Sequence, residues 1–522
     1  MCAVGLLLAG LCLVYEFREM GGAGPTLDDT FIHLQFARNL AHGHGFSFNP
    51  GEPLPGATAP LWVLLLTPLA FGSKQVLVQS SIVLSVLSYL AAGVLAYGLA
   101  RRIELGRGLS LLAGGLVLAN GRMLWAGMSG METDLFAALS LAGFILYLKD
   151  METGRMRLLT AAVFGAASLA RPEGYLLFAG VLVHYLLALR EKKTSTGRDL
   201  LFSLPIVPVL LYIGLILPYM VFSLVTIGHP LPGTFLAKQA DFSWYRESYI
   251  RFTAVYLFLG NPAVALFFLA AIGGSAYRIL RERLSFPAGK DALLLGWPVG
   301  YLAVSAALTP MPFHFCRYQI PVLPFIIISA LLSAKFITRK AQAADSSGEG
   351  VWRRRATYAL YAVFIGGAVI GHVGFQQGRS VLRWAEVTAN SADNINSLHV
   401  RLGKWLHRST DKEALVATQD IGAMGYYSER RILDLVGLVT PEVVPYVSGK
   451  GSTVERSRDL YRFLQKKKPD YLVIFPALYP GLTENRPVFT PVQIITIPDN
   501  QVAAGNRMVL FRCRWGAAGA SP

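Results

Sequence analysis

Long runs of hydrophobic residues, separated by short polar segments, fill the first 375 residues of the chain. A membrane-spanning helix needs about 20 predominantly apolar residues, and most of these runs approach that length. The pattern therefore predicts a polytopic α-helical membrane protein with about 11 transmembrane helices. The expected spans are residues 2–15, 76–100, 108–126, 134–148, 158–170, 174–189, 200–227, 254–277, 292–309, 319–337 and 356–375.

Two apolar segments need separate interpretation. Residues 2–15 are short for a span, and we interpret them as an uncleaved helix because no small-x-small cleavage site follows them. Residues 59–71 contain Pro60 and Pro68. Because proline interrupts the hydrogen-bonding pattern of a helix, this segment predicts a short interfacial or re-entrant helix rather than a full crossing.

The pattern changes after residue 375, where hydropathy falls and short apolar runs alternate with amphipathic segments. Strands are expected at 414–418, 471–474, 492–497 and 508–512, helices near 394–408 and 454–467, and a glycine-rich turn at 420–425. Alternating helices and strands favour an α/β domain. We therefore predict a transmembrane catalytic domain at 1–375, with a long first external loop at 16–58, and a C-terminal α/β domain at 376–522.

The charged residues predict how the chain is oriented. Hydrophobic residues make up 53% of the chain and charged residues 15%, with a formal net charge of +16. Alternate loops between the expected spans hold 20 Lys and Arg residues, far more than the loops on the other side. Cytoplasmic loops carry such an excess, so the first external loop and the C-terminal domain are expected outside the cytoplasm. The basic charge then faces anionic lipid headgroups, and nucleic acid is not expected as a partner.

Adjacent carboxylates, Asp28 and Asp29, open a helical segment just after the first span. Unpaired carboxylates near lipid are costly, so a pair of them indicates general-base chemistry or a cation site. The structural alternative is that Asp28 caps the helix and Asp29 complements its dipole. Residue pattern alone leaves both interpretations open.

The other external loops also carry polar residues that a purely membrane-spanning protein would not need. The set comprises Arg38, His44, Glu132, Arg171, Lys238, His314 and Arg317. Lys238 and Arg317 stand among apolar neighbours, which is typical of contacts to a lipid phosphate or of isolated basic residues that carry no topological information. Glu132 could instead cap a helix, and Arg171 could extend its charged end to the membrane surface. The histidines lack HxxxH or HExxH spacing, and the four cysteines are scattered, so no metal site or disulfide framework is indicated.

Taken in order, these blocks resemble the integral-membrane glycosyltransferases of the GT-C class. The closest similarity is to the bacterial branch containing the mycobacterial cell-wall β-1,2-arabinofuranosyltransferase. The similarity rests on Asp28-Asp29, Arg38-Asn39-Leu40, Gly43-x-Gly45-Phe-x-Phe-Asn-Pro-Gly-Glu52, Ser129-Gly130-Met131-Glu132-Thr133, Arg171-Pro172-Glu173-Gly174, Pro232-x-Thr234-Phe235-x-x-Lys238, Arg317-Tyr318-x-x-Pro321 and Asp420-x-Gly422-x-x-Gly425.

The resemblance implies an enzyme of the bacterial inner membrane that moves a sugar from a polyprenyl-phosphate donor to a glycan, lipid or protein acceptor outside the cytoplasm, with inversion. By similarity, Asp28 is the expected base and Asp29 its helper or substitute. The remaining residues are expected to bind substrate: Arg171, Lys238 and Arg317 the phosphate, Glu132 the sugar, and Arg38, His44 and His314 other parts. No cofactor is expected; some relatives use a divalent metal, but nothing in this sequence demands one.

Three other interpretations compete with this one. A transporter or flippase of envelope glycolipids would place charges at the bilayer midplane and show inverted repeats, whereas the charges here lie at loop edges and no repeat is visible. A transferase of the same class could instead move a preassembled oligosaccharide. The C-terminal domain could also be a binding module on an inactive membrane part. The intact acid pair favours an enzyme.

Overall fold

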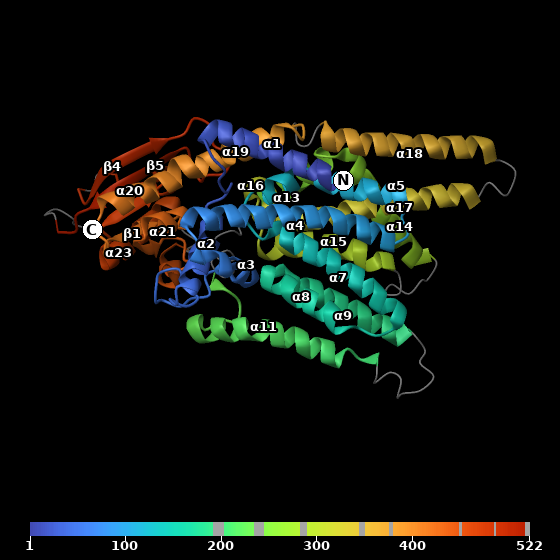
Figure 1. Cartoon of the computed structure of the whole chain (residues 1–522), viewed down its shortest axis with the longest axis horizontal. Coiled ribbons are helices and arrows are strands. Elements are labelled where there is room, and N and C mark those ends of the chain that lie inside the picture. Colours follow the sequence, from blue (N-terminus) through green and yellow to red (C-terminus); the bar gives the residue numbers. More distant parts are fainter. Residues whose placement is uncertain are drawn as a thin grey trace.

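The computed structural model describes residues 1–191, 203–233, 245–281, 290–343, 350–374, 379–447, 452–484 and 487–516. The first part is entirely helical, and its long helices run side by side along the long axis of the molecule (Figure 1). Its elements are α1 (Cys2–Met20), α2 (Asp29–Ala41), α3 (Pro60–Leu66), η1 (Thr67–Phe71), α4 (Lys74–Arg102), α5 (Arg107–Leu118), α6 (Gly121–Gly127), α7 (Thr133–Thr153), α8 (Leu158–Ala170), α9 (Glu173–Glu191), α11 (Ile206–Ile227), α13 (Arg246–Ala254), η3 (Val255–Leu259), α14 (Pro262–Arg281), α15 (Lys290–Leu308), α16 (Phe313–Cys316), η4 (Arg317–Val322), α17 (Leu323–Ala343) and α18 (Gly350–Val373).

Each apolar run forms a helix, but the count of eleven spans is not confirmed. Four of the described helices are long and apolar enough to cross a bilayer, or six if each of two bent pairs counts as one span. The pair α5 and α6 bends by 58°. Other expected spans, such as α8, form shorter apolar helices. The segment 59–71 is the short helical unit α3–η1, as its prolines predicted.

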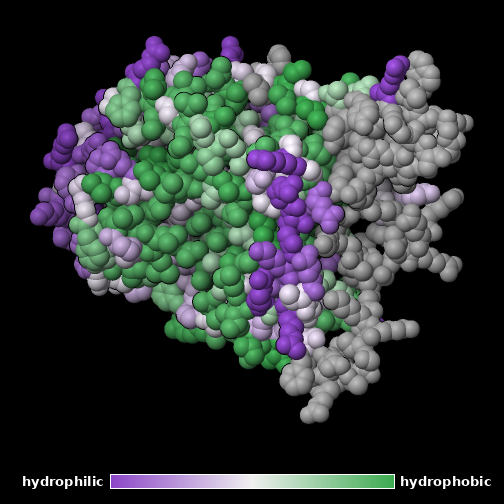
Figure 2. Space-filling model, turned by 45° about the vertical axis from the view of Figure 1, so that its right-hand side comes forward, coloured by the Kyte–Doolittle hydropathy of each residue, from purple (hydrophilic) through white to green (hydrophobic). Residues whose placement is uncertain are grey.

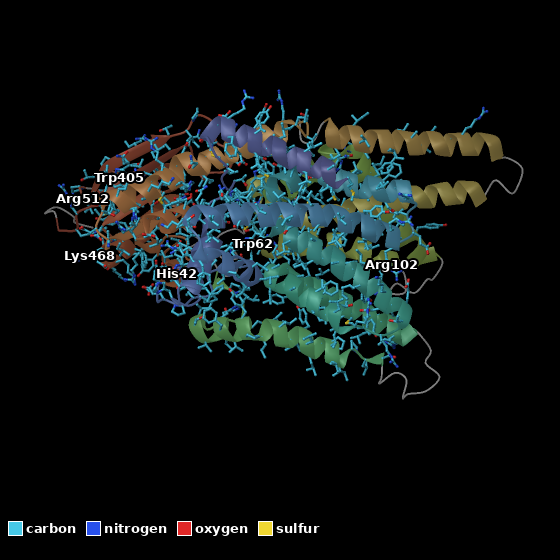
Figure 3. All side chains as sticks on the ribbon, viewed as in Figure 1. His42, Trp62, Arg102, Trp405, Lys468 and Arg512 are labelled. Carbon is cyan, nitrogen blue, oxygen red and sulfur yellow. The ribbon has the colours of Figure 1, made fainter. Side chains whose placement is uncertain are left out.

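The surface of the helical part is that of a membrane protein. A broad hydrophobic face is bounded on both sides by hydrophilic residues (Figure 2). Exposed leucines and valines along α4, including Val83, Leu87 and Val94, contribute to the apolar surface. Arg102, the last residue of α4, lies at the end of the bundle away from the C-terminal domain, whereas His42 lies close to that domain (Figure 3).

The C-terminal part is an α/β domain, as the alternating pattern predicted. Its five-stranded sheet has the order β2-β1-β3-β5-β4, in which β1 pairs in parallel with β2 and β3, and β5 is antiparallel to β3 and β4. The elements are α19 (Arg383–Ile395), η6 (Asn396–Val400), α20 (Arg401–Ser409), β1 (Leu415–Thr418), α21 (Gly422–Ser428), β2 (Arg431–Asp434), η7 (Pro441–Val443), α22 (Val444–Val447), α23 (Thr453–Lys467), β3 (Tyr471–Ile474), η8 (Pro476–Leu478), β4 (Phe489–Thr496) and β5 (Arg507–Cys513).

Two expectations for this domain are corrected. The helix expected at 394–408 is the second half of a longer run, α19–η6–α20, that contains a π-helical segment. The glycine-rich turn expected at 420–425 is wrong, because α21 begins at Gly422. Glycine disfavours helix by about 1 kcal/mol per residue, so local sequence argued against this helix.

The C-terminal domain packs directly on the membrane helices. One hydrophobic core runs from the membrane part through Trp384 and Leu398 to Ala423, while a second fills the space between the sheet and α23. Helices α1 and α19 lie side by side (Figure 1). The first external loop is tied to β2, because the Asn49 side chain donates to the backbone O of Ile432 at 3.0 Å and accepts from its N–H at 2.9 Å. This packing brings loop and sheet to the same cavity.

Candidate active site

A cavity of about 1500 Å³ lies between the membrane helices and the C-terminal domain. One side is apolar and is formed by α9, α11 and α15, with Phe178, Leu182 and Ile216 among its residues. Its other side follows the ends of β1, β2 and β3, where their parallel carboxyl edge meets the membrane part. Ligands bind outside this edge in open α/β sheets. Charged side chains lie between the two sides.

The acid pair divides its contacts between two partners. Asp28 precedes α2 but makes no side-chain cap to it. Its carboxylate instead accepts the N–H groups of Gly422 and Ala423, both at 2.8 Å, in the first turn of α21. A Cβ at Gly422 would overlap the backbone carbonyl of Asp28, so this approach requires glycine. Asp28 therefore joins the first external loop to the C-terminal domain.

Asp28 lies in a charged environment that the C-terminal domain supplies. Burial raises the pKa of Asp28 to about 6; the charges of Asp420 and Asp29 add to the rise, and His399 opposes it. The His399 Nε2 lies 2.8 Å from the Asp420 carboxylate. Burial alone would lower the pKa of His399, but the charges of Asp28 and Asp420 and the hydrogen bond to Asp420 raise it above its ordinary value.

Asp29 faces the basic residue Arg317. The Arg317 guanidinium donates to the Asp29 carboxylate and, at 3.1 Å, to the hydroxyl of Tyr318. Arg317 is 4% exposed, whereas the Asp29 side chain is 37% exposed. The two aspartates therefore differ: the carboxylate of Asp28 caps α21, whereas that of Asp29 faces a cation in the cavity.

A second cluster surrounds Arg171. Its guanidinium donates to Glu132 at 3.0 Å and to Glu173 at 2.7 Å. His33 Nε2 lies 3.5 Å from Glu132, and the Tyr301 hydroxyl donates to Glu173 at 3.3 Å. All five of these residues line the cavity. Since Arg171 is 4% exposed and lies between two carboxylates, much of its charge is already balanced.

His314 precedes Arg317 on a strained segment. His314, Phe315 and Cys316 have φ values of 52°, 56° and 53°, a left-handed conformation that costs non-glycine residues about 1–2 kcal/mol each. The His314 ring lies 3.1 Å from the backbone O of Val502, in the β4–β5 loop. The C-terminal domain thus contacts the segment that places Arg317.

The structure brings most, but not all, of the expected site residues together. Those lining the cavity are Asp28, Asp29, Glu132, Arg171, His314 and Arg317. Arg38 lies elsewhere and forms an ion pair with Glu429, which also contacts Lys74. His44 is exposed and does not line the cavity. The structure therefore does not bring Arg38 and His44 to this cavity, since they lie toward and beyond the far end of α2 from Asp29, and their substrate contacts stay predictions. Lys238 lies outside the described residues.

Sequence reasoning did not select His33, Glu173, His399 or Asp420, all of which line the cavity. A signal for Asp420 was present, since it lies two residues after the end of strand β1. His399 lies in the π-helical segment η6; such segments are frequent at functional sites. Within the described ranges, no group of three or more His, Cys, Asp or Glu side chains is placed to hold a metal ion.

Comparison with known proteins gives similarity at the level of the fold. Residues 391–511 match a family model described as a domain of unknown function (DUF8728). No curated relative matches the chain in sequence. The structure of the Archaeoglobus fulgidus oligosaccharyltransferase with Zn and sulfate superimposes with a TM-score of 0.58 at 12% identity, covering 94% of this chain and 72% of that one.

Two further solved structures contain lipid phosphates. ArnT from Cupriavidus metallidurans bound to undecaprenyl phosphate has a TM-score of 0.55 at 14% identity, covering 99% of both chains. Archaeal AglB from Archaeoglobus fulgidus, in complex with an inhibitory peptide and a dolichol-phosphate, has a TM-score of 0.56 at 12% identity, covering 90% of this chain and 69% of that one. The chain therefore shares the GT-C fold of these proteins.

Proposed function

We propose that the protein is a membrane glycosyltransferase that moves a sugar from a polyprenyl-phosphate donor to a cell-envelope acceptor outside the cytoplasm. The observation that carries this proposal is the Asp29–Arg317 pair in a large cavity between apolar membrane helices and a second domain. A carboxylate to remove a proton and a cation to stabilise a phosphate leaving group are the two groups that such a transfer needs.

The apolar side of the cavity suits the donor's lipid tail. Phe178, Leu182, Ile213, Ile216 and Met220 line it, between α9 and α11. Helix α11 has a largely exposed apolar surface, so a polyprenyl chain could pass from the bilayer into the cavity. Two proteins of this fold have been solved with undecaprenyl phosphate and with a dolichol-phosphate, which supports a donor of this class.

Arg317 is the favoured contact for the donor phosphate. Arg171 already lies between Glu132 and Glu173, whereas Arg317 has a single carboxylate partner among the described residues. A planar guanidinium binds phosphate oxygens through paired hydrogen bonds. When phosphate binds Arg317, the Asp29–Arg317 contact is broken and the Asp29 carboxylate can accept the acceptor's proton. Lys238 remains a prediction.

Asp29 is favoured over Asp28 as the general base. Both oxygens of the Asp28 carboxylate already accept N–H groups of α21, whereas the Asp29 side chain is 37% exposed and lines the cavity. In the transfer, the acceptor hydroxyl attacks the anomeric carbon and gives its proton to Asp29. The bond between that carbon and the phosphate oxygen breaks, and polyprenyl phosphate leaves. One direct displacement inverts the anomeric centre.

The acceptor is placed on the side of the C-terminal domain. Gln419, Asp420, Ser457 and Gln501 line the cavity there, and amides, hydroxyls and carboxylates suit a hydroxyl-rich acceptor. Glu132, held by Arg171, could contact the sugar. The mechanism assigns no step to a metal. The resemblance to the arabinofuranosyltransferase branch implies that the transferred sugar is a pentofuranose, and this is the more specific version of the proposal.

Transfer by the purified protein in liposomes tests this function. The donors are polyprenyl-phosphate sugars, including arabinofuranose, and the acceptor is an envelope glycan fraction. We expect transfer from one donor by the wild type, and loss of transfer with retained donor binding in Asp29→Asn. Transport of a glycolipid across the liposome membrane without transfer would instead establish the flippase alternative. Transfer of an intact oligosaccharide from a lipid carrier would show that the donor is preassembled.

A further inference from the structure

A second, small cavity of about 30 Å³ lies inside the helical part, where α6 and α14 each begin after a short interruption between helices. Its lining includes Asn120, which precedes α6, and Asn261, which precedes α14, together with Arg122, Tyr256 and His372. A cavity needs roughly 10–15 Å³ on this measure to hold one water molecule. This one has space for a single small ion or a water or two.

Arg122 enters this cavity as a buried charge with two unused donors. It is 2% exposed, and its Nη2 donates to the backbone O of Cys316 at 2.6 Å. Its Nε and Nη1 have no hydrogen-bond partner. No carboxylate of the described residues pairs with it. The guanidinium centre lies 4.8 Å from the ring centroid of Tyr256, and a desolvated cation–π contact of this kind supplies about 2 kcal/mol, whereas burying a lone charge costs several kcal/mol.

His372 contributes a further unused donor. It is 2% exposed, and its Nδ1 contacts the Asn261 amide nitrogen. The Asn261 oxygen accepts the N–H of Val264 at 3.0 Å, which fixes the amide orientation. The amide nitrogen, which also donates to the backbone O of Ala368 at 3.0 Å, is therefore assigned as the donor and Nδ1 as the acceptor, which assigns the imidazole proton to Nε2. That Nε2 is buried and has no partner.

The orphaned side-chain atoms of Arg122 and His372 are thus all donors. A water molecule could accept hydrogen bonds from these donors, but its own two hydrogens would then need acceptors. A monatomic anion accepts from several donors and has no hydrogens of its own. The 20-residue helix α14 adds to this preference, since Asn261 caps its N-terminus and a helix N-terminus carries partial positive charge. The charge of Arg122, the donor character of the unpaired atoms and the size of the cavity therefore all favour a small anion.

We propose that this cavity binds one chloride ion, held by Arg122 and His372, as the counter-charge of the buried guanidinium. The site is independent of the transfer reaction proposed above. The ion keeps Arg122 in place, and Arg122 holds the carbonyl of Cys316 at the end of the left-handed segment that leads to Arg317. Halide binding therefore supports the geometry of the larger cavity without contacting substrate.

The test is thermal unfolding of the full-length protein in detergent, with chloride, bromide or gluconate at equal ionic strength. Because a ligand that binds only the folded state stabilises it, the wild type should unfold about 2–4 °C higher in chloride or bromide than in gluconate. Arg122→Met should remove this difference. Arg102→Met is the matched control, since Arg102 pairs with Glu152 and its loss should leave the halide effect intact. In bromide, an anomalous difference peak should appear beside Arg122.

Equal unfolding temperatures for the wild type in chloride and gluconate would overturn the proposal, as would a halide effect that survives in Arg122→Met. If Arg122→Met does not fold, the wild-type comparison and the bromide peak decide. A peak in the cavity that lacks anomalous signal identifies water and also overturns it.

Discussion

The two neighbouring aspartates should fail in different ways when each is replaced by asparagine. Asp28→Asn should loosen the C-terminal domain, because Asp28 accepts two N–H groups of α21. Asp29→Asn should leave the domain docked and abolish transfer, because the Asp29 carboxylate accepts from Arg317 of the membrane part in the cavity. Both changes keep the side-chain size, so the two variants differ only in which carboxylate charge is removed.

The expected cost of Asp28→Asn follows from its contacts. A hydrogen bond to a charged group contributes about 1.5–3 kcal/mol. Asparagine retains one acceptor oxygen, so one of two bonds is lost and the other becomes neutral. Burial raises the pKa of Asp28 to about 6, so the charged form is itself costly to bury. The loss of stability in Asp28→Asn is therefore expected near the lower bound of this range. A loss of about 1.5 kcal/mol makes opening of α21 roughly tenfold more frequent.

Hydrogen–deuterium exchange of residues 422–428 measures this opening, and transfer in liposomes measures activity on the same samples. Asp28→Asn should exchange about tenfold faster in α21 and lose activity only in proportion to the undocked fraction. Asp29→Asn should exchange like the wild type and show no transfer. Asp459→Asn is the control, because Asp459 forms only an exposed pair with Arg462 and should change neither readout.

Either of two results would refute this reasoning. If Asp28→Asn abolishes transfer while α21 exchanges as in the wild type, Asp28 is the base and its contacts to α21 are rearranged during the reaction. If Asp29→Asn retains full transfer, Asp29 has no part in the chemistry and the Asp29–Arg317 pair is structural.

Three further predictions concern the joint between the domains. Gly422→Ala should undock the domain, at about 1–3 kcal/mol for an overpacked contact, while Gly10→Ala, which has open space, should not; differential scanning fluorimetry compares them. Because the folded-state pKa of His399 is raised, its stabilisation is present below its ordinary pKa and lost as pH rises through the folded value, so His399→Gln should flatten the fall in unfolding temperature above about pH 6.5. Burial alone would raise the pKa of Glu429, but Lys74 and Arg38 lower it to about 2. Its contribution should therefore be present above pH 4.5 and lost as pH falls toward 2, and Glu429→Gln should remove this acid-side loss in an unfolding series.

The helices of the membrane part were predictable because hydrophobic runs report directly on burial in lipid. Every apolar run formed a helix, and the prolines at 60 and 68 correctly marked a short unit. What hydropathy could not give was which helices bend or fall short of the bilayer, since α5 and α6 form one continuous apolar run but bend by 58°. Asn120 caps α6 at that bend.

The candidate site shows the same division. The order of polar blocks placed Asp28, Asp29, Glu132, Arg171 and Arg317 together, and the structure brings all five to one cavity. The pattern could not separate the roles of the two aspartates, because the partner of Asp28 lies 394 residues away in the chain.

The sequence by itself determined the helical membrane part, the α/β character of the C-terminal domain and the presence of acids and arginines in the loops between the apolar runs. Hydrophobic periodicity and residue type are local properties, and they carry this information. Only the tertiary structure decided that α21 is a helix despite Gly422 and Gly425, because a carboxylate from the first external loop accepts the N–H groups of its first turn. Contacts between distant residues satisfy buried polar groups, and no periodicity in the chain records them.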